Sequence, residues 1–111
     1  MLSTDEYHGI CVLTAGGDFL APESEIARAA VTQAIDARHI TNFIIELDKC
    51  GYIDSQGLET LCWIRSRCDE LFGMFKLVAP EENCRKILEI TRLDQRFDIE
   101  PDLTTALKAM R

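Results

Sequence analysis

The sequence predicts an α/β domain with a mainly parallel sheet. Short apolar runs typical of strands alternate along the chain with longer segments whose apolar residues recur at helical spacing. Such alternation is typical of folds in which helices cover a parallel sheet. Residues 43–47 are almost continuously apolar, as expected of a central strand buried on both faces. We expect four or five strands and about four helices in one domain spanning residues 1–111.

The first half of the chain is predicted to contain two strands and a long helix. Residues 9–14 form an apolar run that ends at the Gly16-Gly17 turn, which predicts a strand. Pro22 suits the first turn of a helix that precedes the strand at 43–47. The buried face of this helix is expected to hold Ile26, Ala27, Ala30, Val31, Ala34 and Ile35.

The second half begins with a helix predicted from Ser55 to about Phe72. Gly73 follows it in the usual place of a C-cap glycine. Pro80 and the acids after it suit the start of a further helix. Its buried face is expected to hold Cys84, Ile87, Leu88 and Thr91. The remaining elements are predicted as a strand at 74–78, a strand at 97–99 and a helix at 103–110.

The acidic composition limits the classes of partner. A formal net charge of −7 without a clustered basic face argues against nucleic acid and anionic membrane surfaces. A neutral or basic protein is the natural complement. No apolar run approaches the roughly 20 residues of a membrane span. The first residues lack the features of a signal peptide, so we expect a cytoplasmic protein.

Five cysteines and two histidines give no pattern for a metal site or a disulfide framework. There is no C-x-x-C pair, and the number of cysteines is odd. We therefore expect the cysteines to be small buried hydrophobic residues, and we expect no cofactor.

Ser55 lies where a strand and a short loop lead into a helix. A serine at this place suits an N-cap, because its oxygen can accept an unpaired backbone N–H. The start of a helix also favours a phosphate group. The residues alone leave both readings open.

The motifs of three enzyme or nucleotide-binding classes are incomplete. A nucleophile elbow needs glycine where Ile53 stands, and neither His8 nor His39 is placed near Ser55 by the sequence. A phospho-aspartate site at Asp48 would need further carboxylates after the first strand, where only Asp18 is near. The glycine-rich phosphate-binding patterns are absent. We expect a protein that is not an enzyme.

The segment Ile44-Ile45-Glu46-Leu47-Asp48, followed by Tyr52-Ile53-Asp54-Ser55-Gln56-Gly57-Leu58, resembles the signature of STAS domains of the bacterial anti-sigma factor antagonist type. The resemblance continues through residues 75–80, 87–94, 97–99 and 103–107. It implies a STAS-like fold over nearly the whole chain.

The resemblance also implies partner switching. In that family a GHKL-type serine kinase, often the anti-sigma factor itself, phosphorylates the serine that corresponds to Ser55. A PP2C-type phosphatase removes the phosphate, and only the unmodified antagonist binds the kinase. The alternative is a STAS protein that is not phosphorylated and serves as a fixed adaptor in a lipid-transport or stress-signalling complex.

Several residues around Ser55 are candidate contacts with a partner. Asp54 either orients the serine or bonds nearby backbone amides. Trp63 falls opposite the predicted inward face of its helix, so it is either an exposed anchor or lies flat against a neighbouring element. The full set of predicted contact residues is Asp18, Phe19, Asp54, Gln56, Gly57, Glu59 and Trp63.

Three positions depart from the family pattern. Gln56 replaces a second serine, and Arg92 stands where a helix-ending glycine is usual. The turn after the first strand, often G-x-L-D in the family, reads Gly17-Asp18-Phe19-Leu20, so the acidic side chain near the serine is missing or displaced to Asp18.

Overall fold

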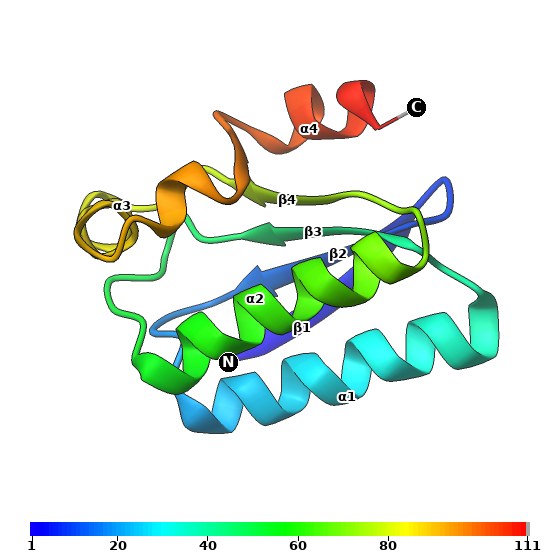
Figure 1. The fold of residues 1–111 in the computed structure, drawn as a ribbon, viewed down its shortest axis with the longest axis horizontal. Helices are drawn as coiled ribbons and strands as arrows, with labels where there is room; N and C mark the ends of the chain where they lie inside the picture. The colour runs from blue at the N-terminus through cyan, green and yellow to red at the C-terminus, as the bar shows by residue number, and fades with distance from the viewer. Residues whose placement is uncertain (111) are drawn as a thin grey trace.

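Strands and helices alternate along the chain in the computed structural model, which describes residues 1–110 (Figure 1). The strands are β1 (Leu2–Tyr7), β2 (Ile10–Ala15), β3 (Asn42–Glu46), β4 (Phe75–Val78) and β5 (Asp98–Glu100). The helices are α1 (Ala21–Arg38), α2 (Ser55–Glu70), α3 (Glu82–Ile90), the short 3-10 helix η1 (Leu93–Gln95) and α4 (Leu103–Ala109).

The strands form one five-stranded sheet in the order β1-β2-β3-β4-β5. β1 pairs with β2 in antiparallel fashion, and the other neighbouring strands are parallel. The predicted α/β fold with a mainly parallel sheet is thus confirmed. The carboxyl ends of β2, β3 and β4 meet at one edge of the sheet, and the chain leaves that edge to enter α1, α2 and α3.

The two faces of the sheet are covered unequally. Side chains alternate between the faces along each strand. Leu13 and Ile45 point into the main core, to which α1, α2 and α3 contribute. Val12 and Ile44 point to the opposite face, where they pack with Ala106 of α4. Figure 1 shows α1 and α2 side by side across one face of the sheet.

The first strand, β1, was not predicted from the sequence. Leu2 is its one buried residue, so it lacks the apolar alternation that reveals a strand. A two-residue turn joins β1 to β2, in which His8 and Gly9 have φ of 52° and 80°. Two left-handed residues in a row are typical of a type I′ hairpin turn, which would have been the sequence signal.

The role predicted for Gly73 is wrong. Phe72, and not Gly73, takes the left-handed conformation after α2, with φ of 59°. Glycine is needed at position 73 for a different reason: a Cβ there would overlap the backbone carbonyl of Thr41. The glycine therefore permits a close approach between two backbone segments.

Four residues predicted on buried helix faces are not fully buried, one of which is the partly buried Ala30 of α1. Ile26 of α1 is 50% exposed. Ile87 of α3 is partly buried, and Thr91 lies exposed just after α3 ends. Arg92, which stands where the family usually has glycine, takes the left-handed conformation with φ of 61°.

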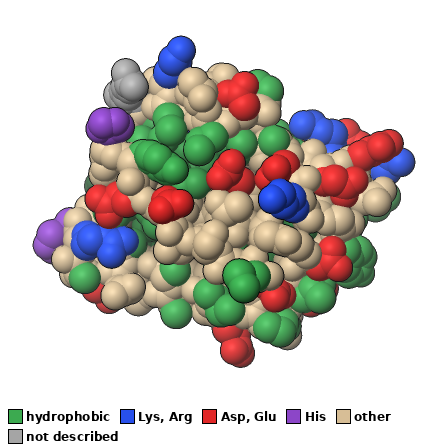
Figure 2. Space-filling view, turned by 180° about the vertical axis from the view of Figure 1, so that it is seen from behind, with side chains coloured by type: hydrophobic (Ala, Val, Ile, Leu, Met, Phe, Trp, Pro, Cys, Tyr) green, Lys and Arg blue, Asp and Glu red, His purple; other side chains and the backbone are tan. Residues whose placement is uncertain are grey.

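The surface of the described residues carries no continuous basic patch on the side seen in Figure 2. Acidic side chains lie around the hydrophobic ones there, and Lys and Arg are scattered. No helix among residues 1–110 is long and apolar enough to cross a membrane.

Candidate functional site

The candidate site lies on the loop between β3 and α2, at the carboxyl edge of the sheet. The backbone carbonyl of Leu47 accepts two hydrogen bonds, from Cys50 N at 3.1 Å and from Glu81 N at 3.0 Å. Because Glu81 is the N-cap of α3, these bonds tie the loop to the start of α3. The segment that leads to Ser55 is thus held on one side by the connection between β4 and α3.

Asp54, and not Ser55, is the N-cap of α2. Its Oδ1 atom accepts a hydrogen bond from Gly57 N at 2.8 Å. Its Oδ2 atom accepts another from Ala21 N, the first residue of α1, at 3.1 Å. Of the two roles left open for Asp54, the structure matches the carboxylate that bonds backbone amides, and it corrects the reading of Ser55 as a cap.

Ser55 is the first residue of α2, and its side chain is exposed. Among residues 1–110, no hydrogen bond is recorded for its hydroxyl. Gly57 N bonds Asp54, and Leu58 N bonds the carbonyl of Asp54. The first N–H groups of a helix have no intrahelical partner, so the N–H groups of Ser55 and Gln56 are available to a group that binds at the start of α2.

Phe19 and Gly57 hold the loop between β3 and α2 in place from its buried side. Phe19 forms an isolated parallel bridge with Ile53, through Phe19 N to Tyr52 O at 2.9 Å and Asp54 N to Phe19 O at 3.4 Å. A Cβ on Gly57 would overlap the carbonyl oxygen of Phe19. Both residues are buried, so neither can contact a partner directly in this conformation. Their part in the site is to position Asp54 and Ser55.

Acidic side chains lie beside the loop. A Cβ built on Gly51 would be 3.6 Å from Asp18 Oδ1 and 3.6 Å from Glu81 Oε2. The two carboxylates therefore flank the chain a few residues before Ser55. Asp18 is exposed and close to the loop, so it is the acidic side chain that the structure offers here.

Trp63 is half-buried and packs against the main core. The guanidinium carbon of Arg28, on α1, lies 5.0 Å from the centre of the Trp63 ring. Arg28 Nε also donates to Thr60 Oγ1 at 3.0 Å. This arrangement is a cation–π contact between α1 and α2. It matches the alternative in which Trp63 lies against a neighbouring helix.

Three of the predicted contact residues share one side of α2 with Ser55. At about 100° per residue, Ser55, Glu59, Trp63 and Gln56 fall within roughly a 100° sector. Ser55, Gln56 and Glu59 are exposed, and Trp63 forms the partly buried edge next to α1. These side chains and Asp18 form what we call the switch surface.

Two buried free cysteines, Cys50 and Cys84, lie beneath the loop and interact with each other. Interaction with the Cys84 thiol lowers the pKa of Cys50, and interaction with Cys50 together with burial raises the pKa of Cys84. The Sγ atom of Cys50 lies 3.3 Å from the carbonyl oxygen of Tyr52. In residues 1–110 no group of three or more His, Cys, Asp or Glu side chains is arranged to hold a metal ion.

A family model for the STAS domain matches residues 1–106. The chain therefore belongs to the STAS domain family. No curated protein gives a significant match to it.

The fold is similar to that of solved anti-sigma factor antagonists. A candidate antagonist from Thermotoga maritima has a TM-score of 0.89 at 19% identity, over 99% of this chain and 94% of that one. An antagonist from Mycobacterium paratuberculosis has a TM-score of 0.83 at 24% identity, over 100% and 93%. The phosphorylated form of SpoIIAA from Bacillus has a TM-score of 0.79 at 18% identity, over 100% of both chains.

Proposed function

We propose that this protein regulates by partner switching and that phosphorylation of Ser55 is the switch. The observation that carries the proposal is that Asp54 and Ser55 have different roles at the start of α2. Asp54 caps the helix through Gly57, which leaves the exposed hydroxyl of Ser55 free for modification. Family membership supports it, since a phosphorylated form of SpoIIAA, a protein of similar fold, has been solved.

A phosphate on Ser55 is compatible with the fold. It would add nearly two negative charges beside the first N–H groups of α2, where the helix dipole favours an anion. The two hydrogen bonds of the Asp54 carboxylate do not involve the Ser55 side chain. We therefore expect the modified domain to stay folded with its cap in place.

The same phosphate would weaken a complex formed through the switch surface. The added charge would have to be desolvated at the interface or would meet acidic groups there. Asp18 and Glu81 already make this region acidic, so a partner that binds it would present neutral or basic side chains. The expected loss of affinity is about tenfold or more.

The partners we propose are a GHKL-type serine kinase that also acts as an anti-sigma factor and a PP2C-type phosphatase. The exposed contacts on this side are Ser55, Gln56, Glu59 and Asp18, with the partly buried Trp63 at the edge. Asp54, Phe19 and Gly57 hold this surface in shape from within the loop.

We propose that Ser55 is acted upon and is not itself a catalyst. His8 lies in the β1–β2 turn and His39 follows α1, and both positions precede parallel strands. Ser55 follows the carboxyl end of β3, at the other edge of the sheet. A serine nucleophile needs a base within hydrogen-bond reach, and neither histidine occupies that place.

The test compares Ser55→Ala with Ser55→Asp in binding to a kinase captured from the native cells. Ser55→Ala should bind as the unmodified protein does, and Ser55→Asp should bind about tenfold or more weakly. Thr104→Asp places the same charge at an exposed position on α4, which packs on the opposite face of the sheet, and serves as the control. Equal binding by both Ser55 variants would contradict the switch and favour a fixed adaptor.

A further inference from the structure

A groove between α2 and the turn from η1 to β5 has no part in the proposed switch. Its cavity volume is about 380 Å³. That is within the range of roughly 300–1,000 Å³ typical of small-molecule sites. Arg65, on α2, and Arg96, which follows η1, line it from two sides. Arg65 lies ten residues beyond Ser55, about 15 Å along the helix axis.

The two arginines are poorly neutralised. Arg96 has no ion-pair partner within the part of the chain that the structure describes. Arg65 reaches Asp69 with an Nε–Oδ2 distance of 3.7 Å, and the two side chains are 45% and 67% exposed. An exposed pair of this kind is weak, so the Arg65 guanidinium can exchange partners readily.

The groove is therefore locally positive on an acidic protein. Asp69 is the acidic side chain that lines it, against the two guanidinium groups. In the adjoining cavity, Asp98 shares Lys76 with Glu100, at distances of 3.7 Å and 3.0 Å. At physiological salt the remaining negative charge of the protein is screened beyond about 8 Å. An anion in the groove would mainly meet the two arginines.

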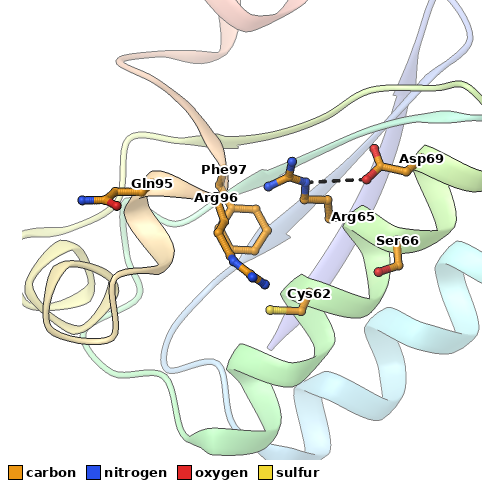
Figure 3. Close-up of a pocket in the computed structure, with 7 residues that line it drawn as sticks. All are labelled: Cys62, Arg65, Ser66, Asp69, Gln95, Arg96 and Phe97. Atoms are coloured by element: carbon orange, nitrogen blue, oxygen red, sulfur yellow. Dashed lines mark ion pairs between the residues drawn. The ribbon is translucent and has the colours of Figure 1, made fainter.

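Phe97 gives the floor of the groove a small, fixed apolar area within an otherwise mostly polar lining. Phe97 is 8% exposed, and its ring packs edge to face on Phe75 with the ring centres 5.9 Å apart. Figure 3 shows the Phe97 ring between the side chains of Arg65 and Arg96, with Cys62 below it. A rigid aromatic surface between two guanidinium groups can receive a flat apolar body whose charged end is held by the arginines.

We propose that this groove binds a small organic anion. A phosphate or carboxylate group is held by Arg65 and Arg96, and an aromatic or otherwise apolar body lies on Phe97. The guanidinium fork matches both anionic groups in geometry. On binding, the anion takes the place of Asp69 as the partner of Arg65. The site does not depend on Ser55 and adds a ligand to a domain proposed to act through protein contacts.

The test is a titration of the isotope-labelled chain followed by NMR, with phenyl phosphate and benzoate as the probes. At least one of them should give saturable shifts at residues 65–66 and 96–97, with a Kd of about 1 mM or lower. The stronger of the two identifies the preferred anionic group. Phenol, which lacks the charge, and inorganic phosphate, which lacks the ring, should bind more weakly than that probe.

Matched variants locate the site. Arg65→Gln and Arg96→Gln should each weaken binding about tenfold or more. Arg85→Gln, at an exposed position on α3 outside the groove, and Ser55→Asp should leave binding unchanged. All four changes are at exposed residues, and the spectra themselves report folding. The proposal is overturned if neither aromatic probe saturates, if Arg96→Gln binds like the unmodified chain, or if inorganic phosphate binds as tightly as the stronger of the two aromatic probes.

Discussion

The Oδ2 atom of Asp54 accepts a hydrogen bond from the backbone N–H of Ala21 at 3.1 Å, which joins the start of α1 to the cap of α2. The other oxygen of the same carboxylate caps α2 itself. One side chain thus satisfies an N–H at the start of each of two helices that are far apart in sequence. This contact sets the position of Ser55, which directly follows Asp54.

Replacing Asp54 with alanine should therefore destabilise the domain. Two backbone N–H groups lose their acceptor, and the expected decrease in the free energy of unfolding is about 1–3 kcal/mol. Urea denaturation measures it. Asp48→Ala is the control, because Asp48 is exposed and no side-chain hydrogen bond or ion pair is recorded for it within residues 1–110. Equal midpoints for the two variants would contradict the double cap.

Gly57→Ala should be among the most destabilising alanine substitutions in the loop. The new methyl group would overlap the carbonyl oxygen of Phe19 and would lie 2.6 Å from Ile53 Cγ2. We expect a decrease in the free energy of unfolding of about 3 kcal/mol from overpacking. Gly17→Ala adds the same methyl group where nothing lies within 4 Å. If both variants unfold at the same urea concentration, the close approach at Gly57 is not rigid.

Arg92→Gly should stabilise the protein. Arg92 has φ of 61°, a left-handed conformation. This conformation is unfavourable for a residue with a Cβ atom but not for glycine. The expected gain in the free energy of unfolding is about 0.5–1 kcal/mol. Arg85→Gly, within α3, should instead lower stability by about 1 kcal/mol. A loss of stability for Arg92→Gly, measured by the same denaturation, would mean that the arginine side chain makes a compensating contact.

Native-state thiol labelling should modify Cys62 and spare the other four cysteines, which are buried. The reactive species is the thiolate, and burial raises the pKa of Cys68 to about 12 and also raises that of Cys11. A raised pKa leaves less thiolate at about pH 8, so these thiols stay protonated. Cys50 has a lowered pKa but no exposed surface. Mass spectrometry should find one label, absent in Cys62→Ser; a label on Cys50 would mean that the loop opens.

The sequence predicted the order of the elements from β2 to α4, apart from η1, and the strand–loop–helix element that carries Ser55, because apolar periodicity and such a motif are local signals. It put the cap at Ser55 and not at Asp54, since adjacent residues of both types suit that role and helix boundaries are uncertain by a residue. β1 was not predicted, because it has one buried residue and little apolar alternation.

Contacts between segments that are far apart in the chain could not be predicted from the sequence. The cation–π contact of Arg28 with Trp63 depends on how α1 packs on α2, and helix periodicity alone placed Trp63 outward. The groove formed by Arg65 and Arg96 depends on the turn from η1 to β5 lying beside α2. Neither pair of residues shares a motif that would have linked them.

The central claim is that Ser55 is a phosphorylation switch, and the intact mass of the protein isolated from its native cells tests it most directly. The account predicts that a fraction carries one phosphate, that site mapping places it on Ser55, and that it disappears in Ser55→Ala. A single unmodified species across growth and stress conditions would contradict the account, and Ser55 would then be only the first residue of a helix capped by Asp54.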